Sequence, residues 1–432
     1  MIYVYPLRFF KVPPSMPRIP ENPLAELLRI TSVFGMAAGI FLATATVGAQ
    51  VLPVDSYQAS SKTLSESGIV FRCTSQQLLE LQPVVDAYLE SLGVDLTLMS
   101  KQTGVQPDTL AYTLIGPSSI SNTLDLIDHA SSGLTDELVE LPAARGEKTT
   151  VLTVSKKEIV YAMLQHGRTT LFIGPACDVQ ALKDHVGVRQ NIVAWTESLA
   201  WKWPNGGSAR WNKKYWKQGT PVKGPFLHEA VNDVFLNQEQ YAMGCFAAIK
   251  LVMIQGILDY YRRIKKDPVT STLIEARLLQ GGEPLDDIEP GVMWNFEVNS
   301  TPQERARPGK LLGIQYGVPA DNFIPGDWAY FLNTDPVTYG KIGYEGSNAV
   351  YLGRGKFNDF YNDHHHYYTY KEKLNEVYQW RNKVFSRRRD VARVKPLSAA
   401  DFERLSKTPE RGGIQLDLRG IPFMFGYQNL PQ

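Results

Sequence analysis

Apolar residues recur at three- and four-residue spacings in two stretches of the first half of the chain. These are QQLLELQPVVDAYLESLGVDL (Gln76 to Leu96) and SNTLDLIDHASSGL (Ser121 to Leu134). Such spacing places the apolar side chains on one face of a helix, so both stretches are predicted to be amphipathic helices. Gly93 is expected to end the first one, because glycine readily adopts the left-handed conformation that follows a helix.

Residues 149 to 177 combine two kinds of pattern. TTVLTVSKKEIVYAML (Thr149 to Leu164) begins as a short apolar run and continues with helical spacing. This predicts a strand and then a helix capped by Ser155. TTLFIGPAC (Thr169 to Cys177) is a second short apolar run, closed by a Gly-Pro pair. Together with the two preceding helices, these elements predict an α-rich accessory domain over residues 50 to 190.

A third helical stretch, YAMGCFAAIKLVMIQGILDYY, runs from Tyr241 to Tyr261. Between Cys245 and Leu258 the only charged residue is Lys250, so this helix is expected to be buried on nearly all sides. Cys245 lies in its first turn.

Three later stretches favour antiparallel strands, because they combine alternation, aromatic residues and Gly-containing turns. They are DNFIPGDWAYF (Asp321 to Phe331), YEGSNAVYLGRGKF (Tyr344 to Phe357) and FYNDHHHYYTY (Phe360 to Tyr370). A charged helix from Tyr370 to about Phe385 follows. A buried helix against an antiparallel sheet is an α+β arrangement, which we assign to a catalytic domain over residues 191 to 395. Residues 396 to 432 are assigned to a C-terminal tail.

The N-terminal segment looks like a targeting sequence. Residues Ile30 to Val54 carry no charged side chain, and basic residues outnumber acidic ones before them. A basic lead, a small-residue apolar stretch and Val47-x-Ala49 before Gln50 are typical of a secretory signal peptide. A membrane anchor is the alternative, since about 20 apolar residues can span a bilayer. Residues 1 to 49 therefore predict a protein that is secreted, periplasmic or held at the cell surface.

Amino-acid composition and net charge exclude several classes of protein. The 432 residues are 44% hydrophobic and 21% charged, which excludes wholesale disorder, collagen and coiled coil. The formal net charge of +1 gives no reason to expect a nucleic-acid partner. Three cysteines exclude a disulfide-rich scaffold and a four-thiolate zinc site, and leave at least one sulfur without an internal partner.

A tryptophan-rich segment follows the accessory region. Its five tryptophans lie within 22 residues: Trp195, Trp201, Trp203, Trp211 and Trp216. We expect them to pack a long loop onto the core. The alternative is an exposed platform for glycans or peptides.

Cys245 is the candidate nucleophile. A thiol in the first turn of a helix meets unpaired backbone N–H groups and the positive end of the helix dipole, which stabilise the thiolate. The same N–H groups can hold an oxyanion when the sulfur attacks a carbonyl, and Gly244 permits close approach of a substrate. The competing interpretation is an inert buried cysteine. A cysteine at a buried helix start followed by an antiparallel sheet is the order of papain-like cysteine enzymes.

The Cys245 helix, the stretch FIPGDWAYFLNTDP, and GSNAVYLGRGKF with the KEKLNEV helix resemble the bacterial spore-coat type of protein-glutamine gamma-glutamyltransferase (transglutaminase). The similarity covers about residues 225 to 384, and the spacing also resembles the NlpC/P60 group of papain-like amidases. The resemblance implies a papain-like fold with Cys245 as nucleophile. It also implies protein substrates that supply glutamine and lysine side chains, and no cofactor.

The sequence departs from that family around the nucleophile. Gly244 stands where the family has an acidic residue, and Ser347 stands where a catalytic glutamate precedes the Asn of a Gly-Glu-Asn element. Glu345, two residues earlier on the same strand face, is a candidate substitute. The family histidine falls at Phe360, beside Asp359.

A short insertion would bring a nearby histidine into the catalytic position. We therefore assign His364 as the acid and base, with Asp359 or Glu345 orienting its ring. His364 and His366 on one strand face also suggest zinc, but two ligands do not make a site, so no metal is predicted.

The resulting hypothesis is a thiol acyltransferase that forms gamma-glutamyl isopeptide crosslinks through a thioester on Cys245. One alternative is a papain-like cysteine hydrolase, either a peptidase or a peptidoglycan amidase. Another is a catalytically inactive binding protein of the same fold, as Gly244 and Ser347 suggest. In an oxidising compartment Cys73 and Cys177 are expected to form a disulfide, leaving Cys245 free.

Overall fold

The computed structural model describes residues 67–103, 108–115, 133–204, 209–217, 219–279, 313–339, 341, 344–361, 366–380, 397–407 and 412–420. All of them belong to one compact unit, Tyr57–Gln432, distinct from Met1–Ser56. The expected signal peptide or anchor, at residues 1 to 49, lies outside the described residues. So does nearly all of the helix predicted at Ser121 to Leu134.

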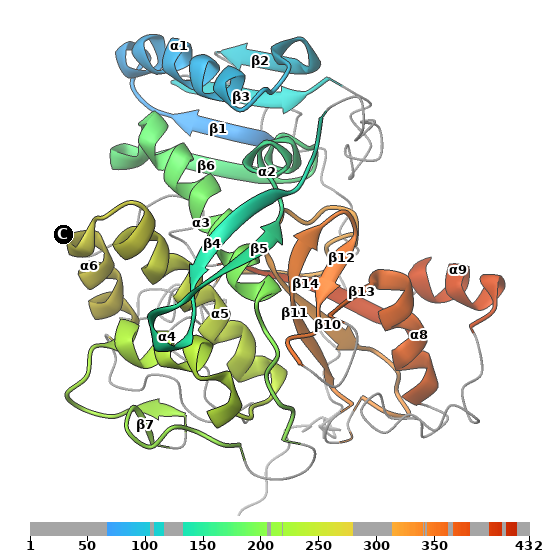
Figure 1. Ribbon diagram of the computed structural model, residues 1–432. Coiled ribbons are helices and arrows are strands. Elements are labelled where there is room, and N and C mark those ends of the chain that lie inside the picture. The colour runs from blue at the N-terminus through green and yellow to red at the C-terminus, as the bar shows by residue number, and fades with distance from the viewer. Residues whose placement is uncertain are drawn as a thin grey trace, which may run out of the picture. The chain divides into compact units, whose positions relative to one another are not determined.

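The N-terminal part of this unit is built on a four-stranded sheet (Figure 1). Its strands, in the order β2-β3-β1-β6, are β2 (Met99–Thr103), β3 (Thr109–Leu114), β1 (Gly68–Arg72) and β6 (Thr169–Ile173). β1 pairs antiparallel with β3 and parallel with β6. The predicted first helix is confirmed as α1 (Ser75–Ser91), and Gly93 follows its end with a φ of 73°.

The predicted strand and helix after residue 148 are also confirmed. β5 (Lys148–Thr153) pairs with β4 (Glu137–Pro142) in a two-stranded hairpin, and α2 (Lys156–Met163) follows. Ser155 caps α2, because its hydroxyl accepts a hydrogen bond from the backbone N–H of Glu158 at 3.2 Å.

The expectation of an α-rich accessory region needs correction, because all six strands from β1 to β6 lie within it. GIVFR (β1) and TLAYTL (β3) are too short to show a decisive period. They become strands by pairing with each other, while β1 also pairs with the distant β6 and β3 with β2. Such non-local pairing leaves little trace in a local pattern.

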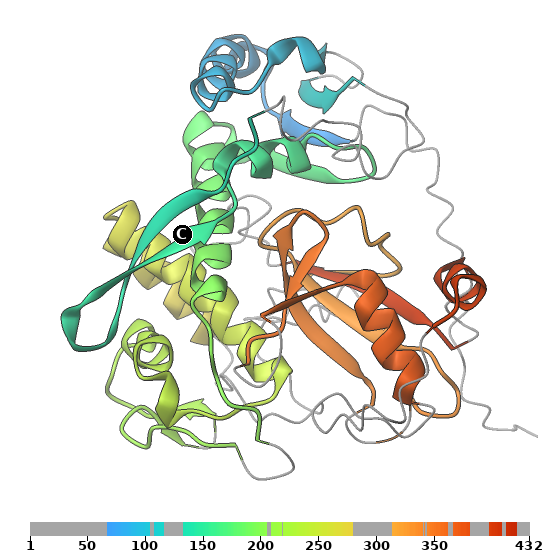
Figure 2. The same ribbon diagram turned by 45° about the vertical axis from the view of Figure 1, so that its right-hand side comes forward.

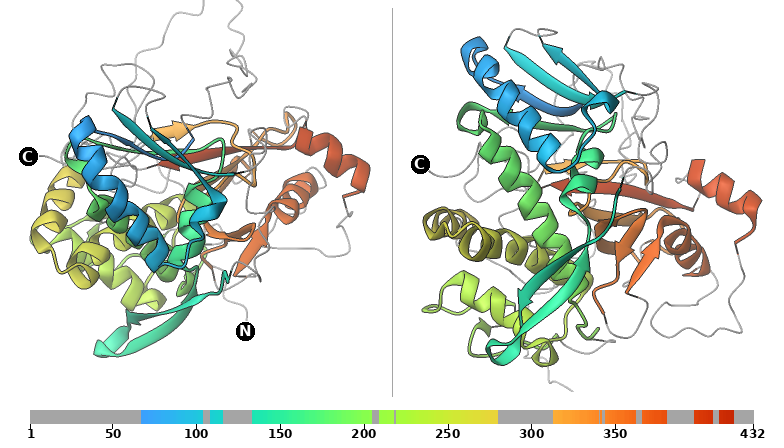
Figure 3. Two further views of the ribbon diagram at one scale, coloured as in Figure 1. Left: turned by 90° about the horizontal axis from the view of Figure 1, so that it is seen from above. Right: turned by 45° about the horizontal axis from the view of Figure 1, so that its top comes forward.

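Two long helices form the centre of the unit. They are α3 (Val179–Glu197) and α5 (Cys245–Asp259); α4 (Leu227–Leu236) and α6 (Pro268–Leu279) complete the helical part. Figure 3 shows α3, in green, extending from the four-stranded sheet into this helical part. Gly256 of α5 lets the two long helices touch, since a Cβ there would lie 2.2 Å from Cγ1 of Ile192 in α3.

The C-terminal part is a six-stranded antiparallel sheet in the order β13-β12-β11-β10-β14-β9. Its strands are β9 (Gly313–Gln315), β10 (Trp328–Asn333), β11 (Gly346–Gly353), β12 (Lys356–Asn358), β13 (Tyr367–Thr369) and β14 (Ile414–Gly420). The predicted strands are thus confirmed, although β10 and β13 are shorter than the sequence stretches that predicted them. β14 and α9 (Ala399–Lys407) place regular structure in the predicted tail.

The register of β10 and β11 decides what each face of this sheet covers. Trp328 lies opposite Val350, and both belong to the core that α3 and α5 share. Phe331 and Ala349 belong to the other face, whose core includes Leu374 of α8 (Tyr370–Trp380). Figure 2 shows α8 lying along that face. The arrangement is α+β, with the cysteine-bearing helix buried against an antiparallel sheet.

The tryptophan-rich segment packs inward, as expected. Trp195, Trp201 and Trp216 are buried, and Trp216 lies in a small pairing of β7 (Trp216–Lys217) with β8 (Thr220–Pro221). Their indole N–H groups all have acceptors within the protein. Trp203 and Trp211 pack against the same core while half-buried.

The division expected between residues 190 and 191 stays a prediction. Both residues lie within α3, whose buried side chains share one core with α2 and α5.

Candidate active site

Cys245 is the first residue of α5, and its surroundings differ from those of the rest of that helix. The Cys245 side chain is half-buried, whereas Ala247 to Leu258 are buried. Gly244 is the N-cap in an extended conformation and provides no side-chain cap. Its carbonyl oxygen accepts the first helical bond, from Ala248 N at 3.0 Å. The first turn therefore presents backbone N–H groups beside the sulfur, as the sequence predicts.

The other two cysteines are joined. Cys73, just after β1, and Cys177, just before α3, form a disulfide with an S–S distance of 2.00 Å. The expected pairing is confirmed, and Cys245 is the free thiol.

Asn348 of β11 provides two hydrogen-bond donors to Cys245. Its backbone N lies 3.5 Å and its side-chain Nδ2 3.6 Å from Sγ. Sulfur accepts such bonds more strongly as a thiolate than as a thiol, because the bond is then charge-assisted. Asn348 is not among the site residues predicted from the sequence. Its only signal was its place in Gly346-Ser347-Asn348, the segment that resembles the Gly-Glu-Asn element.

A third residue completes this chain of contacts. The indole Nε1 of Trp328 donates a hydrogen bond of 2.8 Å to the amide Oδ1 of Asn348. Trp328 is 1% exposed and Asn348 is 4% exposed, so both groups are held away from solvent.

Two tyrosines lie within electrostatic range of Cys245. Burial raises the pKa of Tyr330 to about 12; Arg419 opposes the shift, and the negative charges of Cys245 and Glu345 add to it. Burial is also the main reason why the pKa of Tyr368 lies well above its usual value. The negative charge of Asp359 adds to this shift, and that of Cys245 adds less. Both phenols are therefore protonated near neutral pH and able to donate a hydrogen bond.

The two predicted carboxylates lie at the ends of neighbouring strands of the sheet that carries Asn348. Glu345 directly precedes β11, and Asp359 directly follows β12 and is buried. Each acts electrostatically on a tyrosine that also responds to Cys245. Within the part of the chain that the structure describes, none of Glu345, Asp359 and His366 is hydrogen-bonded to the sulfur.

His364, the predicted acid and base, lies outside the described residues. His366 is described and is engaged elsewhere: its Nε2 lies 2.5 Å from Oε2 of Glu197, at the end of α3. Its backbone oxygen accepts hydrogen bonds from Asn358 Nδ2 at 3.1 Å and Asp359 N at 2.9 Å. His366 thus links the end of α3 to the end of β12.

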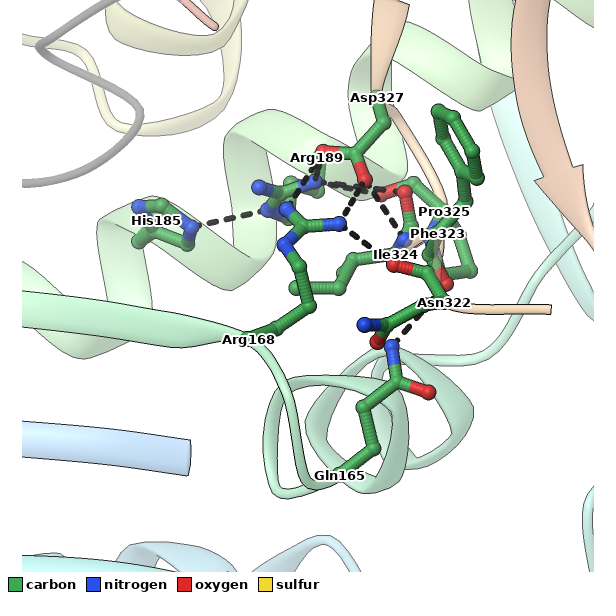
Figure 4. Close-up of polar contacts among 9 residues, drawn as sticks. All are labelled: Gln165, Arg168, His185, Arg189, Asn322, Phe323, Ile324, Pro325 and Asp327. Carbon is green, nitrogen blue, oxygen red and sulfur yellow. Dashed lines mark hydrogen bonds and ion pairs between the residues drawn. The ribbon is translucent and has the colours of Figure 1, made fainter. Parts of the chain in front are cut away.

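A buried ionic cluster fixes the turn that leads into β10 (Figure 4). Asp327 is 2% exposed and accepts hydrogen bonds from Arg168 Nη1 and Arg189 Nη1, both at 2.8 Å. Burial opposes ionisation of Asp327, but the two guanidinium groups hold its pKa below the usual value. Arg189 Nε also donates to Nε2 of His185 at 2.8 Å, and burial keeps the pKa of His185 well below its usual value.

This cluster gives a structural role to the Pro325-Gly326-Asp327 segment, which the sequence indicates only as part of a resemblance. Arg168 precedes β6 and Arg189 lies on α3, so the cluster ties the N-terminal part of the fold to the start of β10. Gly326 has a φ of 87°, and a Cβ there would lie 3.0 Å from Cα of Arg189. A side chain at this position would separate the turn from α3.

No group of three or more His, Cys, Asp or Glu side chains suited to a metal ion occurs among the residues that the structure places. Likewise, none of the helices placed combines the length and apolar character needed to cross a bilayer.

Comparison with known proteins gives one family match. A family model described as protein-glutamine gamma-glutamyltransferase matches residues 141–406. No curated protein matches the chain. Among solved structures, a transglutaminase from Geobacillus stearothermophilus without its C-terminal extension is similar at 19% identity and a TM-score of 0.34. That match covers 57% of this chain and 95% of the other.

Proposed function

Since the chain belongs to the protein-glutamine gamma-glutamyltransferase family, we propose that it forms isopeptide bonds between protein glutamine and lysine side chains through a thioester on Cys245. The observation that carries this proposal is the position of the Cys245 sulfur. It lies at the start of α5, facing two N–H donors of Asn348 at 3.5 and 3.6 Å.

In the acylation step, the Cys245 thiolate attacks the side-chain carboxamide carbon of a glutamine. A C–S bond forms while the carbonyl electron pair moves onto oxygen, and the intermediate collapses as the C–N bond breaks. The nitrogen takes a proton and leaves as ammonia. N–H groups of Asn348 and of the first turn of α5 are the donors available to stabilise the oxyanion.

A second residue must carry the proton that ammonia takes and later accept one from the incoming lysine. Asp359 is our first candidate among the described residues, because it is buried and directly follows β12, which pairs with the Asn348-bearing strand β11. Glu345 is the second, because it directly precedes β11. From the sequence, His364 remains a third candidate for this proton carrier.

Attack by a lysine amine on the thioester carbonyl breaks the C–S bond and gives the crosslink, whereas attack by water gives deamidation. The half-buried Cys245, packed with Phe246 against the core that includes Trp328, favours the amine by limiting access of water.

One observation favours a different candidate, an inactive binding protein of the same fold. The resemblance places Ser347 where the family has a catalytic glutamate.

The test incubates the purified chain with a glutamine peptide and a primary-amine probe, with Cys245→Ala as the control. We expect amine incorporation that the control loses. Peptide cleavage without incorporation would instead indicate a hydrolase. If neither occurs and iodoacetamide fails to alkylate Cys245, the enzymatic proposals are wrong.

We also propose that the protein works outside the cytoplasm. The Cys73–Cys177 disulfide supports this proposal, since disulfides persist mainly in oxidising compartments. Cleavage after residue 49, detected by N-terminal sequencing of the exported protein, would test the predicted signal peptide.

A further inference from the structure

We propose that Trp328 is a positioning residue for the cysteine site. Its indole N–H holds the Asn348 amide in the one orientation that directs Nδ2 toward the Cys245 sulfur. The inference rests on the proposed function only in taking Cys245 as the reacting group.

The oxygen and nitrogen of asparagine have nearly the same shape, so a rotation of 180° exchanges an acceptor for a donor. A tryptophan indole N–H only donates. With Nε1 of Trp328 2.8 Å from the amide of Asn348, the oxygen must face the indole and the NH₂ group must face Sγ.

The opposite orientation would be unfavourable at both ends. The NH₂ group would face the indole N–H, and the amide oxygen would face a negatively charged sulfur. Trp328 and Asn348 are nearly excluded from water, so solvent cannot relieve the conflict between their N–H groups.

The indole itself has little freedom to move. Trp328 packs at 6.2 Å between ring centroids against Phe246, the residue after Cys245, and the guanidinium of Arg419 lies 5.7 Å from its ring. Its backbone is paired on both sides, with Val350 of β11 and Arg419 of β14. The preceding residue, Asp327, is held by the buried ionic cluster (Figure 4).

The test measures alkylation of Cys245 by iodoacetamide across pH in the full chain, where the other two cysteines are disulfide-bonded. Trp328→Phe removes the N–H but keeps an aromatic ring. Losing the directed N–H donor should lower the fraction of thiolate near neutral pH about tenfold. The remaining thiolate is intrinsically more nucleophilic, so alkylation should be only about threefold to fivefold slower. At high pH, where the thiol is fully ionised, the variant should react at least as fast as the wild type.

Trp216→Phe is the matched control. Trp216 is equally buried, but its Nε1 donates to the backbone oxygen of Ala230 at 3.2 Å, outside the contacts of Cys245. Its alkylation profile should match that of the wild type.

A double-mutant cycle separates positioning from packing. If Trp328 acts through Asn348, then adding Trp328→Phe to Asn348→Ala slows alkylation no further. Additive slowing, or a uniform loss at every pH, would overturn the proposal.

Asn348→Asp tests the same orientation if Trp328→Phe does not fold. It retains an oxygen for the indole and turns the other oxygen toward the sulfur. We expect it to slow neutral-pH alkylation at least as much as Asn348→Ala, and faster alkylation would contradict the proposal. None of these readouts needs a glutamine substrate, so they are independent of whether the chain crosslinks proteins.

Discussion

Asn348 approaches the sulfur of Cys245 from the neighbouring sheet, with its backbone N 3.5 Å and its amide Nδ2 3.6 Å from Sγ. The proposed nucleophile belongs to α5 and the donors to β11, so packing of the helix on the sheet assembles the site. This relationship links the conformation of the central sheet to the reactivity of one thiol.

Asn348→Ala removes the side-chain donor and keeps the backbone donor. If the amide also stabilises the oxyanion, kcat/KM for amine incorporation should fall about 10²-fold, as for other oxyanion donors. Steady-state kinetics with a glutamine peptide checks this, and thermal unfolding monitors the fold. Unchanged kinetics in a folded variant would remove Asn348 from the mechanism.

Asp359→Asn and Glu345→Gln distinguish the two carboxylates proposed as proton carriers. Loss of a general acid and base lowers kcat by about 10² to 10⁴. We expect that loss for Asp359→Asn and a smaller effect for Glu345→Gln, both measured by steady-state kinetics with a glutamine peptide. Full activity in both variants would leave His364 as the remaining candidate for the proton carrier, and His364→Ala would then be the deciding variant.

Asp327→Asn should destabilise the fold strongly, because it leaves Arg168 and Arg189 buried without their carboxylate. Breaking a buried ion pair from one side costs about 3 to 5 kcal/mol. Glu140→Gln is the contrasting control, since its pair with Lys148 is exposed and such pairs contribute about 0 to 1 kcal/mol. Denaturant unfolding measures both, and equal effects would show that the cluster contributes little to stability.

His185 should make the free energy of unfolding fall as pH drops below about 6.5. Burial keeps its pKa in the folded protein well below the ordinary value of about 6.5, so the unfolded chain binds a proton that the folded one does not. Stability from this group is therefore present above pH 6.5 and lost below it, at up to about 1.4 kcal/mol per pH unit. His185→Gln retains an acceptor for Arg189 Nε and should show a weaker decline between pH 6.5 and 5. An identical decline would assign the acid sensitivity to other groups.

Much of the local structure is predictable from the sequence because its causes are local. The apolar run after Cys245 gives α5, Ser155 caps α2, and Gly93 ends α1. The number of cysteines and their positions give the disulfide.

Other features depend on residues that are far apart in the chain. Asp327 meets Arg168 and Arg189 across 159 and 138 residues, and no motif indicates those partners. The role of Asn348 depends on where its backbone N–H and its amide lie, and both reach Cys245 only because β11 packs beside α5. Strands β1 and β3 were missed for the same reason, since their pairing is not local.

The most direct test of the central claim is a search for the acyl-enzyme. The full chain is mixed with a glutamine peptide in the absence of amine, quenched in acid and examined by mass spectrometry. We predict an adduct on Cys245 with the mass of the peptide minus ammonia, which disappears when a primary amine is added and is absent in Cys245→Ala. A thiol that iodoacetamide alkylates readily but that never acquires the peptide would contradict the account.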